Sequence, residues 1–327
     1  MTKALNNGIS AYKLPFVLAV VIFVLAHPGL TTAQSLQEIR IGSSNISVTN
    51  FTAFYARDRK FFEKENLDVK IIIVKTEVAI PALVARNLDY TTLSTSSIEA
   101  TLKGMPLRLV AVTNQYPLLG LVVREGINKV PDLKGKKLAI SSFGGAVYGA
   151  ALNLLKTHGL KPQEDVAVLA TGANAARIAA LKQGAVDAAL ISSPDDIRVA
   201  RDGLKILLDA GTVYRLPFGG ISTTLTKIRE SPAEVKKVVR AVVRATKFIT
   251  ESQNKDDVIN YIVTFFKLDR SFADEFYRRL VPSLSPTGIV DRDKIKLVID
   301  SAIERGLTDK PLDPEMVVDF SFAKEVS

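Results

Sequence analysis

The chain has 327 residues, of which 47% are hydrophobic and 24% charged, and its formal net charge is +9. This length and composition are typical of a globular protein with one large core or two smaller ones, and the lack of cysteine excludes disulfides, thiolate chemistry and cysteine metal ligands. The positive charge is spread along the chain beside acidic residues, without a basic segment rich in aromatics, so we expect no nucleic-acid partner.

The first segment has the order of a secretory signal peptide. Lys3 and Lys13 precede an apolar run of 13 residues (14–26), and Thr31 and Ala33 stand at the −3 and −1 positions of a cleavage site. A membrane anchor is the alternative, but about 18 apolar residues are needed to cross a bilayer. We therefore predict a signal peptide at residues 1–33, cleavage after Ala33 and a periplasmic location. Nucleotides are scarce there, which weakens any nucleotide-binding interpretation.

The next segment alternates short apolar runs with helical patterns. Strands are predicted at residues 39–42, 69–74, 90–93, 107–112 and 118–124. Helices are predicted at residues 51–65, 78–86 and 97–102. This alternation predicts helices that cover a largely parallel sheet.

The pattern then starts again. Strands are predicted at residues 137–140, 166–169, 188–191 and 205–208, and helices at residues 146–158, 175–182 and 195–202. In both passes a leucine precedes an aspartate by six residues, and two hydroxyl residues follow that aspartate at the fifth and sixth positions. The aspartates are Asp89 and Asp187, and the leucines are Leu83 and Leu181. This internal similarity predicts two lobes built on similar units.

The composition changes after Gly220. A last strand is predicted at residues 222–225, and amphipathic helices at residues 232–253, 255–266, 271–280 and 291–305. We therefore expect a discontinuous assembly. Lobe I would hold residues 34–122 and 222–327, and lobe II residues 123–221. Two strands that cross between the lobes would form a hinge, with a cleft beside it.

Small polar residues follow almost every predicted strand. Ligands of open α/β sheets bind at this position, beyond the carboxyl ends of strands and at helix N-termini. Helix capping favours the same residue types and explains any single loop. Six such loops in both lobes favour a cleft that binds a small polar or anionic solute. The candidate ligand-binding residues are Ser43, Ser44, Asn45, Thr95, Ser96, Ser97, Asn114, Ser141, Ser142, Phe143, Gly144, Gly145, Asn174, Ser193 and Asp195.

The loop at residues 141–145 reads Ser-Ser-Phe-Gly-Gly and opens a predicted helix. It matches neither G-x-G-x-x-G nor G-x-x-x-x-G-K-[ST], so a nucleotide site is disfavoured. His27 lies in the predicted leader, and His158 lies at a helix end, where we expect a capping role. Neither H-E-x-x-H nor G-x-S-x-G occurs. We expect no catalytic residue, no metal and no cofactor.

Three segments carry a resemblance to a known family. They are FYARDRKFFEKENLDV (residues 54–69), VPDLKGKKLAI (130–140) and the helix–strand segment at residues 180–189. Together they resemble periplasmic substrate-binding proteins of the sulfonate, nitrate and taurine uptake group, which also includes binding proteins for thiamine-precursor pyrimidines. Here Lys60 stands where that family usually has glycine. That departure falls on a helix surface.

The resemblance implies an α/β fold of the type II periplasmic-binding-protein class. Each lobe would be a mainly parallel sheet flanked by helices, hinged by two crossing strands. It also implies a monomeric receptor that closes on a small solute and delivers it to the permease and ATPase of an ABC importer. The implied ligand loops are residues 43–45, 95–97 and 141–145 and the region of Asn174.

The choice of solute stays open at this point. Donor-rich loops suit a sulfonate, nitrate or taurine, whereas Phe143 and Asp195 suit an amine or a pyrimidine. Two other functions are considered: a ligand-sensing domain for a signalling partner, and an enzyme similar to the pyrimidine synthases of thiamine biosynthesis. The export signal and the missing cysteine argue against the enzyme.

Overall fold

The computed structural model describes residues 35–143, 145–309 and 312–327. The chain divides into two units, Met1–Ser35 and Leu36–Ser327, and only the second is described below. The predicted signal peptide therefore lies outside the described residues. No helix within these described ranges is both long enough and apolar enough to cross a membrane.

The first sheet contains five strands in the order β2-β1-β3-β10-β4. Their bounds are Leu67–Ile73 (β2), Gln37–Ser43 (β1), Tyr90–Thr91 (β3), Gly219–Thr224 (β10) and Leu107–Asn114 (β4). Strand β1 runs parallel to β2 and β3, whereas β10 runs antiparallel to β3 and β4. The antiparallel β10 enters this sheet after the chain has built the second one.

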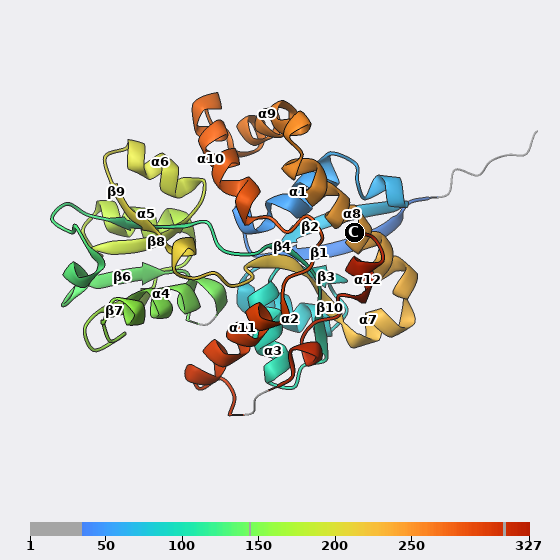
Figure 1. The fold of residues 1–327 in the computed structure, drawn as a ribbon, viewed down its shortest axis with the longest axis horizontal. Helices are drawn as coiled ribbons and strands as arrows, with labels where there is room; N and C mark the ends of the chain where they lie inside the picture. Colours follow the sequence, from blue (N-terminus) through green and yellow to red (C-terminus); the bar gives the residue numbers. More distant parts are fainter. Residues whose placement is uncertain (1–34, 144, 310–311) are drawn as a thin grey trace, which may run out of the picture. The chain divides into compact units, whose positions relative to one another are not determined.

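The second sheet repeats this arrangement, in the order β7-β6-β8-β5-β9. Its strands are Ala167–Ala170 (β7), Lys137–Ile140 (β6), Ala188–Ser192 (β8), Leu119–Val123 (β5) and Lys205–Asp209 (β9). Strand β6 is parallel to β7 and β8, and β5 is antiparallel to β8 and β9. The predicted two-lobed α/β fold is thus confirmed (Figure 1). Residues 119–122, which we expected in the first lobe, belong to the second sheet.

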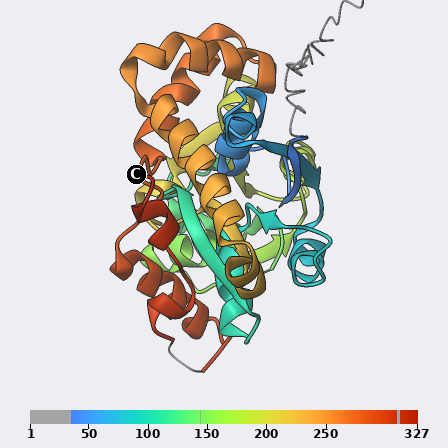
Figure 2. The ribbon, with the colours of Figure 1, turned by 90° about the vertical axis from the view of Figure 1, so that its right-hand side faces the viewer.

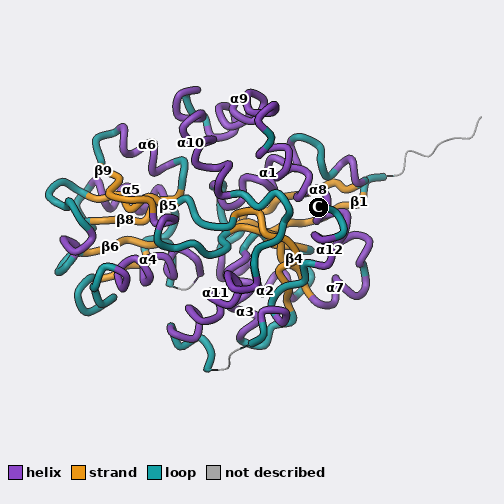
Figure 3. Tube along the Cα trace, in the orientation of Figure 1, coloured by secondary structure: helices purple, strands orange, loops and turns teal. Residues whose placement is uncertain are grey.

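Helices cover both sheets (Figure 3). With the second sheet lie α4 (Gly145–Thr157), α5 (Asn174–Lys182) and α6 (Asp195–Arg201). The other helices are α1 (Phe51–Asp58), α2 (Thr76–Val84), α3 (Ser94–Leu102), α7 (Leu225–Glu230), α8 (Pro232–Thr250), α9 (Lys255–Phe266), α10 (Arg270–Ser283), α11 (Arg292–Glu304) and α12 (Ser321–Lys324). The single helix predicted at residues 51–65 is interrupted, because Lys60 adopts a φ of 63° and only a short 3-10 turn follows at Glu63–Glu65.

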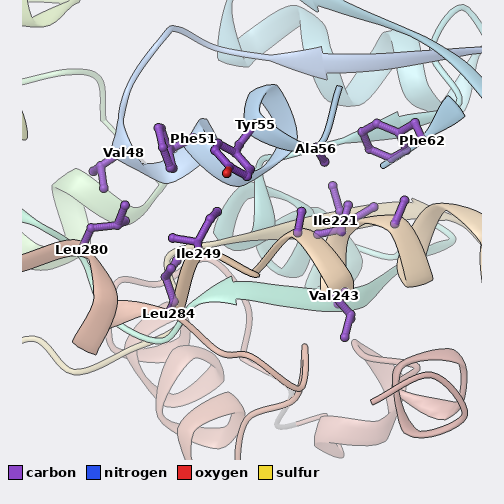
Figure 4. Packing of buried hydrophobic residues seen from close by; sticks show 14 of the residues in the cluster. Val48, Phe51, Tyr55, Ala56, Phe62, Ile221, Val243, Ile249, Leu280 and Leu284 are labelled. Atoms are coloured by element: carbon purple, nitrogen blue, oxygen red, sulfur yellow. The ribbon is translucent and has the colours of Figure 1, made fainter. Parts of the chain in front are cut away.

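Helix α8 is central to the larger core. Its buried Val235, Val238, Val239 and Val242 recur at helical spacing, so one apolar stripe lies along the helix. This helix runs beside β4 (Figure 2). Aromatic side chains of α1 close the same core, where Phe51 and Tyr55 and residues such as Ile249 are fully buried (Figure 4).

The internal similarity seen in the sequence is a structural repeat. The Asp89 carboxylate accepts a hydrogen bond from the Arg40 backbone N–H, and Asp187 accepts one from the Lys137 N–H, both at 2.9 Å. The helix before each aspartate is followed by a residue in the left-handed conformation, Arg86 beside the first sheet and Gly184 beside the second. Equivalent loops of the two repeats therefore have equivalent positions on their sheets.

Candidate functional site

A cavity of about 520 Å³ lies between the two sheets. Residues just beyond the carboxyl ends of β1, β3, β6 and β7 line it, among them Ser44, Thr92, Ser141 and Gly172. The first turns of α2, α3, α4 and α5 line it as well. Both lobes thus contribute the same structural position, the junction of a strand end with a helix start.

Seven of the candidate ligand-binding residues line this cavity. They are Ser44, Asn45, Thr95, Ser96, Ser141, Ser142 and Gly145. Phe143 lines an adjoining second cavity instead and is 59% exposed. Gly144 lies outside the described residues.

The other candidates do not line the main cavity. They are Ser43, Ser97, Asn114, Asn174, Ser193 and Asp195. Most have partners inside the protein: Ser193 Oγ donates to Asp196 Oδ1 at 2.7 Å, and Asp195 Oδ2 accepts from Asn174 Nδ2 at 2.8 Å. Ser43 Oγ likewise donates to the Asn45 carbonyl. These residues shape the loops rather than face the cavity, because successive side chains leave a strand end in different directions.

Capping does not explain the polar residues at three of the helices. The N-cap positions of α2, α3 and α5 are Lys75, Leu93 and Ala173, none of which has an acceptor that can cap. The small polar residues come after the cap, within the first turn or on neighbouring loops. We also expected residues 94–96 to be a loop, whereas α3 already begins at Ser94.

Hydroxyl groups in α3 lack partners. Ser94 Oγ and Thr95 Oγ1 are buried and form no hydrogen bond within the described residues, and both side chains line the cavity. Buried hydroxyls are nearly always satisfied, and an unmade hydrogen bond costs about 1–3 kcal/mol. A polar ligand in the cavity would remove this cost.

Arg177 is the most informative residue of the cavity, and sequence reasoning missed it. It lies on α5, is 2% exposed and lines the cavity. Its Nη1 donates to the Leu190 carbonyl at 2.6 Å, and its Nη2 donates to Asn174 Oδ1. Its Nε–H has no acceptor among the described residues, and no ion pair with a carboxylate is found there.

Burial lowers the pKa of the Arg177 guanidinium to about 10, and the nearby charge of Asp195 opposes that shift. The side chain is still a cation at neutral pH. A buried cation with a free donor and no paired carboxylate is a place for an anion. Only a weak feature of the sequence indicates this anion site: Asn174 and Arg177 are three residues apart, on one face of a helix.

The remaining lining sets the character of the cavity. Lys75 and Glu77 are exposed charged residues of the lining, and Leu93, Val147 and Phe218 add apolar surface. Cations outnumber carboxylates in this lining. A solute with an anionic group and an apolar body fits such a surface.

His158 lies away from this cavity. Its Nδ1 lies 2.8 Å from the Leu154 carbonyl, at the end of α4. Within the described ranges, no group of three or more His, Asp or Glu side chains could hold a metal ion.

The family model described as NMT1/THI5 like matches residues 48–255, which is more than half of the chain. The chain therefore belongs to the NMT1/THI5-like family. No curated protein matches it.

Solved structures share the fold at low sequence identity. The periplasmic aliphatic sulphonate binding protein SsuA from Escherichia coli is 21% identical, with a TM-score of 0.70, over 86% of this chain and 92% of that one. The periplasmic nitrate-binding protein NrtA from Synechocystis PCC 6803 is 14% identical, with a TM-score of 0.74, over 89% and 88%. The desulfurization enzyme DSZB is 15% identical, with a TM-score of 0.64, over 88% and 98%. The fold is that of periplasmic solute-binding proteins.

Proposed function

We propose that this protein is an extracytoplasmic receptor that binds a small anionic organic solute between its two lobes and presents it to an ABC importer. The observation that carries the proposal is Arg177, a buried guanidinium in the cavity with an N–H that no described group accepts. Unpartnered hydroxyls of Ser94 and Thr95 add donors of the kind that hold sulfonate or carboxylate oxygens.

Closure of the lobes on the solute is part of the proposal. Within the described residues, two segments link the sheets: residues 115–118 between β4 and β5, and residues 210–218 between β9 and β10. We place the hinge there, with lobe I formed by the first sheet and lobe II by the second. A rotation at these links would open the cavity without breaking either sheet.

The comparisons support a binding role and a periplasmic location. Two neighbours in fold are periplasmic binding proteins for an aliphatic sulphonate and for nitrate. The predicted signal peptide agrees with export. An importer permease with its ATPase is the partner class that this location favours.

An enzyme is the second function to weigh, because DSZB has the same fold. The lining of the main cavity offers hydroxyls, Lys75, Glu77 and Arg177, but no histidine. His158, the histidine of the described ranges, already has a backbone partner. Reversible binding therefore accounts for the cavity better than turnover does.

Calorimetry with an alkanesulfonate, a carboxylate of equal length and nitrate tests the proposal. We expect binding of at least one anion, and a loss of at least tenfold in affinity for Arg177→Met, since a charged hydrogen bond contributes about 1.5–3 kcal/mol. Arg244→Met is the matched control, because Arg244 is paired with Glu65 and does not line the cavity.

Thermal unfolding of both variants separates binding from folding. A folded Arg177→Met protein that binds as tightly as the original chain contradicts the proposal. So does the original chain if it binds none of the anions.

A further inference from the structure

A second cavity adjoins the main one. Its volume is about 340 Å³, and it shares Thr76, Glu77, Ser96, Ser142 and Gly145 with the first cavity. Because these residues line both spaces, the two cavities lie side by side. Phe143 lines the second cavity.

The volume argues against a small inorganic anion as the whole ligand. The main cavity alone holds about 520 Å³, whereas a water molecule takes up about 30 Å³ in the liquid. A nitrate ion bound at Arg177 would leave most of the site to water. A multi-carbon anion would fill it and bury the apolar lining.

An aromatic pair forms one wall of the second cavity. The Phe143 and Tyr148 rings meet edge to face, with centroids 5.5 Å apart and planes at 89°. Phe143 stays 59% exposed. An exposed ring on a protein surface is ordinary by itself, but this one lines a cavity next to the one that the buried Arg177 lines. A third ring could pack on it at 4.5–7 Å, the usual spacing of aromatic pairs.

Two cations line the same cavity. The Lys103 side chain is exposed and forms no hydrogen bond or ion pair with another described residue. The Arg305 side chain is 6% exposed and pairs with Glu99 at 2.7 Å through Nη2, while its buried Nη1 has no hydrogen-bond partner. Cations near a ring attract its face, so they favour an aromatic group over a saturated one.

We propose that the solute is an organic anion with an aromatic ring. Its anionic group is held by Arg177, and its ring lies in the second cavity against Phe143, near Lys103 and Arg305. This inference rests on the proposed function and names the solute class of the same site.

Three sulfonates test it by calorimetry: methanesulfonate, cyclohexanesulfonate and benzenesulfonate. The last two have the same carbon number and the same charge, so only aromaticity and ring shape differ. We expect benzenesulfonate to bind about tenfold more tightly than cyclohexanesulfonate, the upper range for an aromatic pair. Phe143→Leu should remove this difference between the two ring compounds.

Leu169→Ala serves as the control. Leu169 is an exposed apolar residue of β7 in the second sheet and lines neither cavity. If methanesulfonate binds through Arg177 but the two ring compounds bind equally, the aromatic solute class is wrong and the receptor function stands. If Phe143→Leu leaves the preference for benzenesulfonate intact, the placement of the ring is wrong. If no anion binds, both proposals fail.

Discussion

A single buried arginine decides the chemistry of the cavity. Arginine is normally exposed or paired, so a sequence pattern assigns Arg177 to a helix surface. The structure places it at 2% exposure with an unsatisfied Nε–H. Its burial depends on α5 packing against the second sheet, which no local spacing encodes. The neighbouring hydroxyl residues were predictable, because strand ends and helix starts have clear sequence signals.

Anion binding through Arg177 should depend on pH in a defined direction. Burial lowers the pKa of this guanidinium to about 10. Below that pH it is charged and affinity should be constant. Above it the unliganded protein has lost the proton that the anion requires, so affinity should fall by up to about tenfold per pH unit. Calorimetry from pH 7 to pH 10.5 measures the profile.

The Lys75→Met variant controls for the other cation of the main cavity. The fall in affinity at high pH should persist in this variant. If the affinity of the original chain does not change up to pH 10.5, anion binding does not depend on the charge of Arg177.

At the scale of elements, α3 and α4 meet across the lobes. Glu99 of α3 accepts a hydrogen bond from the Gly145 N–H at 3.0 Å, where α4 begins. Its other oxygen pairs with Arg305, which directly follows α11. The carboxylate thus fills the N-terminus of α4, which we had regarded as free for the solute. Ser141, Ser142 and Gly145 line the main cavity, but the first N–H of α4 is already occupied by Glu99.

Removal of Glu99 should therefore destabilise the ligand-free protein. Glu99→Ala leaves Arg305 buried without its partner, which costs about 3–5 kcal/mol, and it also frees the first N–H of α4. Urea unfolding gives the change in free energy. Glu304→Ala is the matched control: its pair with Lys156 also reaches α4, but both side chains are more than half exposed, so the loss should stay under about 1 kcal/mol. Equal losses in the two variants would contradict this role of Glu99.

The elements themselves were largely predictable, within limits that have physical causes. Hydrophobic periodicity indicated the long amphipathic helices well, α8 among them, since one apolar stripe persists over several turns. Short helices were less clear. α3 begins three residues earlier than predicted, because Ser94, Thr95 and Ser96 resemble a loop although their backbone is helical.

At the scale of the molecule, the two lobes should move as units. A compact chain of residues 36–327 has an expected radius of gyration of about 19 Å. We expect small-angle scattering to give this value with a bound anion and a larger one without it, because the two links between the sheets are short and the sheets share no strand. Arg177→Met should remove the response to the anion. A radius that is the same with and without a tightly bound anion would exclude closure.

The repeated unit was recognisable from the spacing of Asp89 and Asp187, but the way the units join was not. Strand β5 pairs antiparallel with β8 and β9, and β10 pairs antiparallel with β3 and β4. In each case the paired strands lie far apart along the chain. Pattern reasoning therefore placed the first crossing within β5, a few residues too late.

Strand β10 comes late in the chain, and this order has a consequence for folding during synthesis. It separates β3 from β4 in the first sheet, yet it is synthesised after every strand of the second sheet. During synthesis, β4 exposes an unpaired edge until residue 224 has emerged, and α8 has not yet covered the apolar residues beneath it. The contiguous second sheet can form meanwhile. A chaperone that holds the emerging N-terminal segment would protect the nascent chain during this interval.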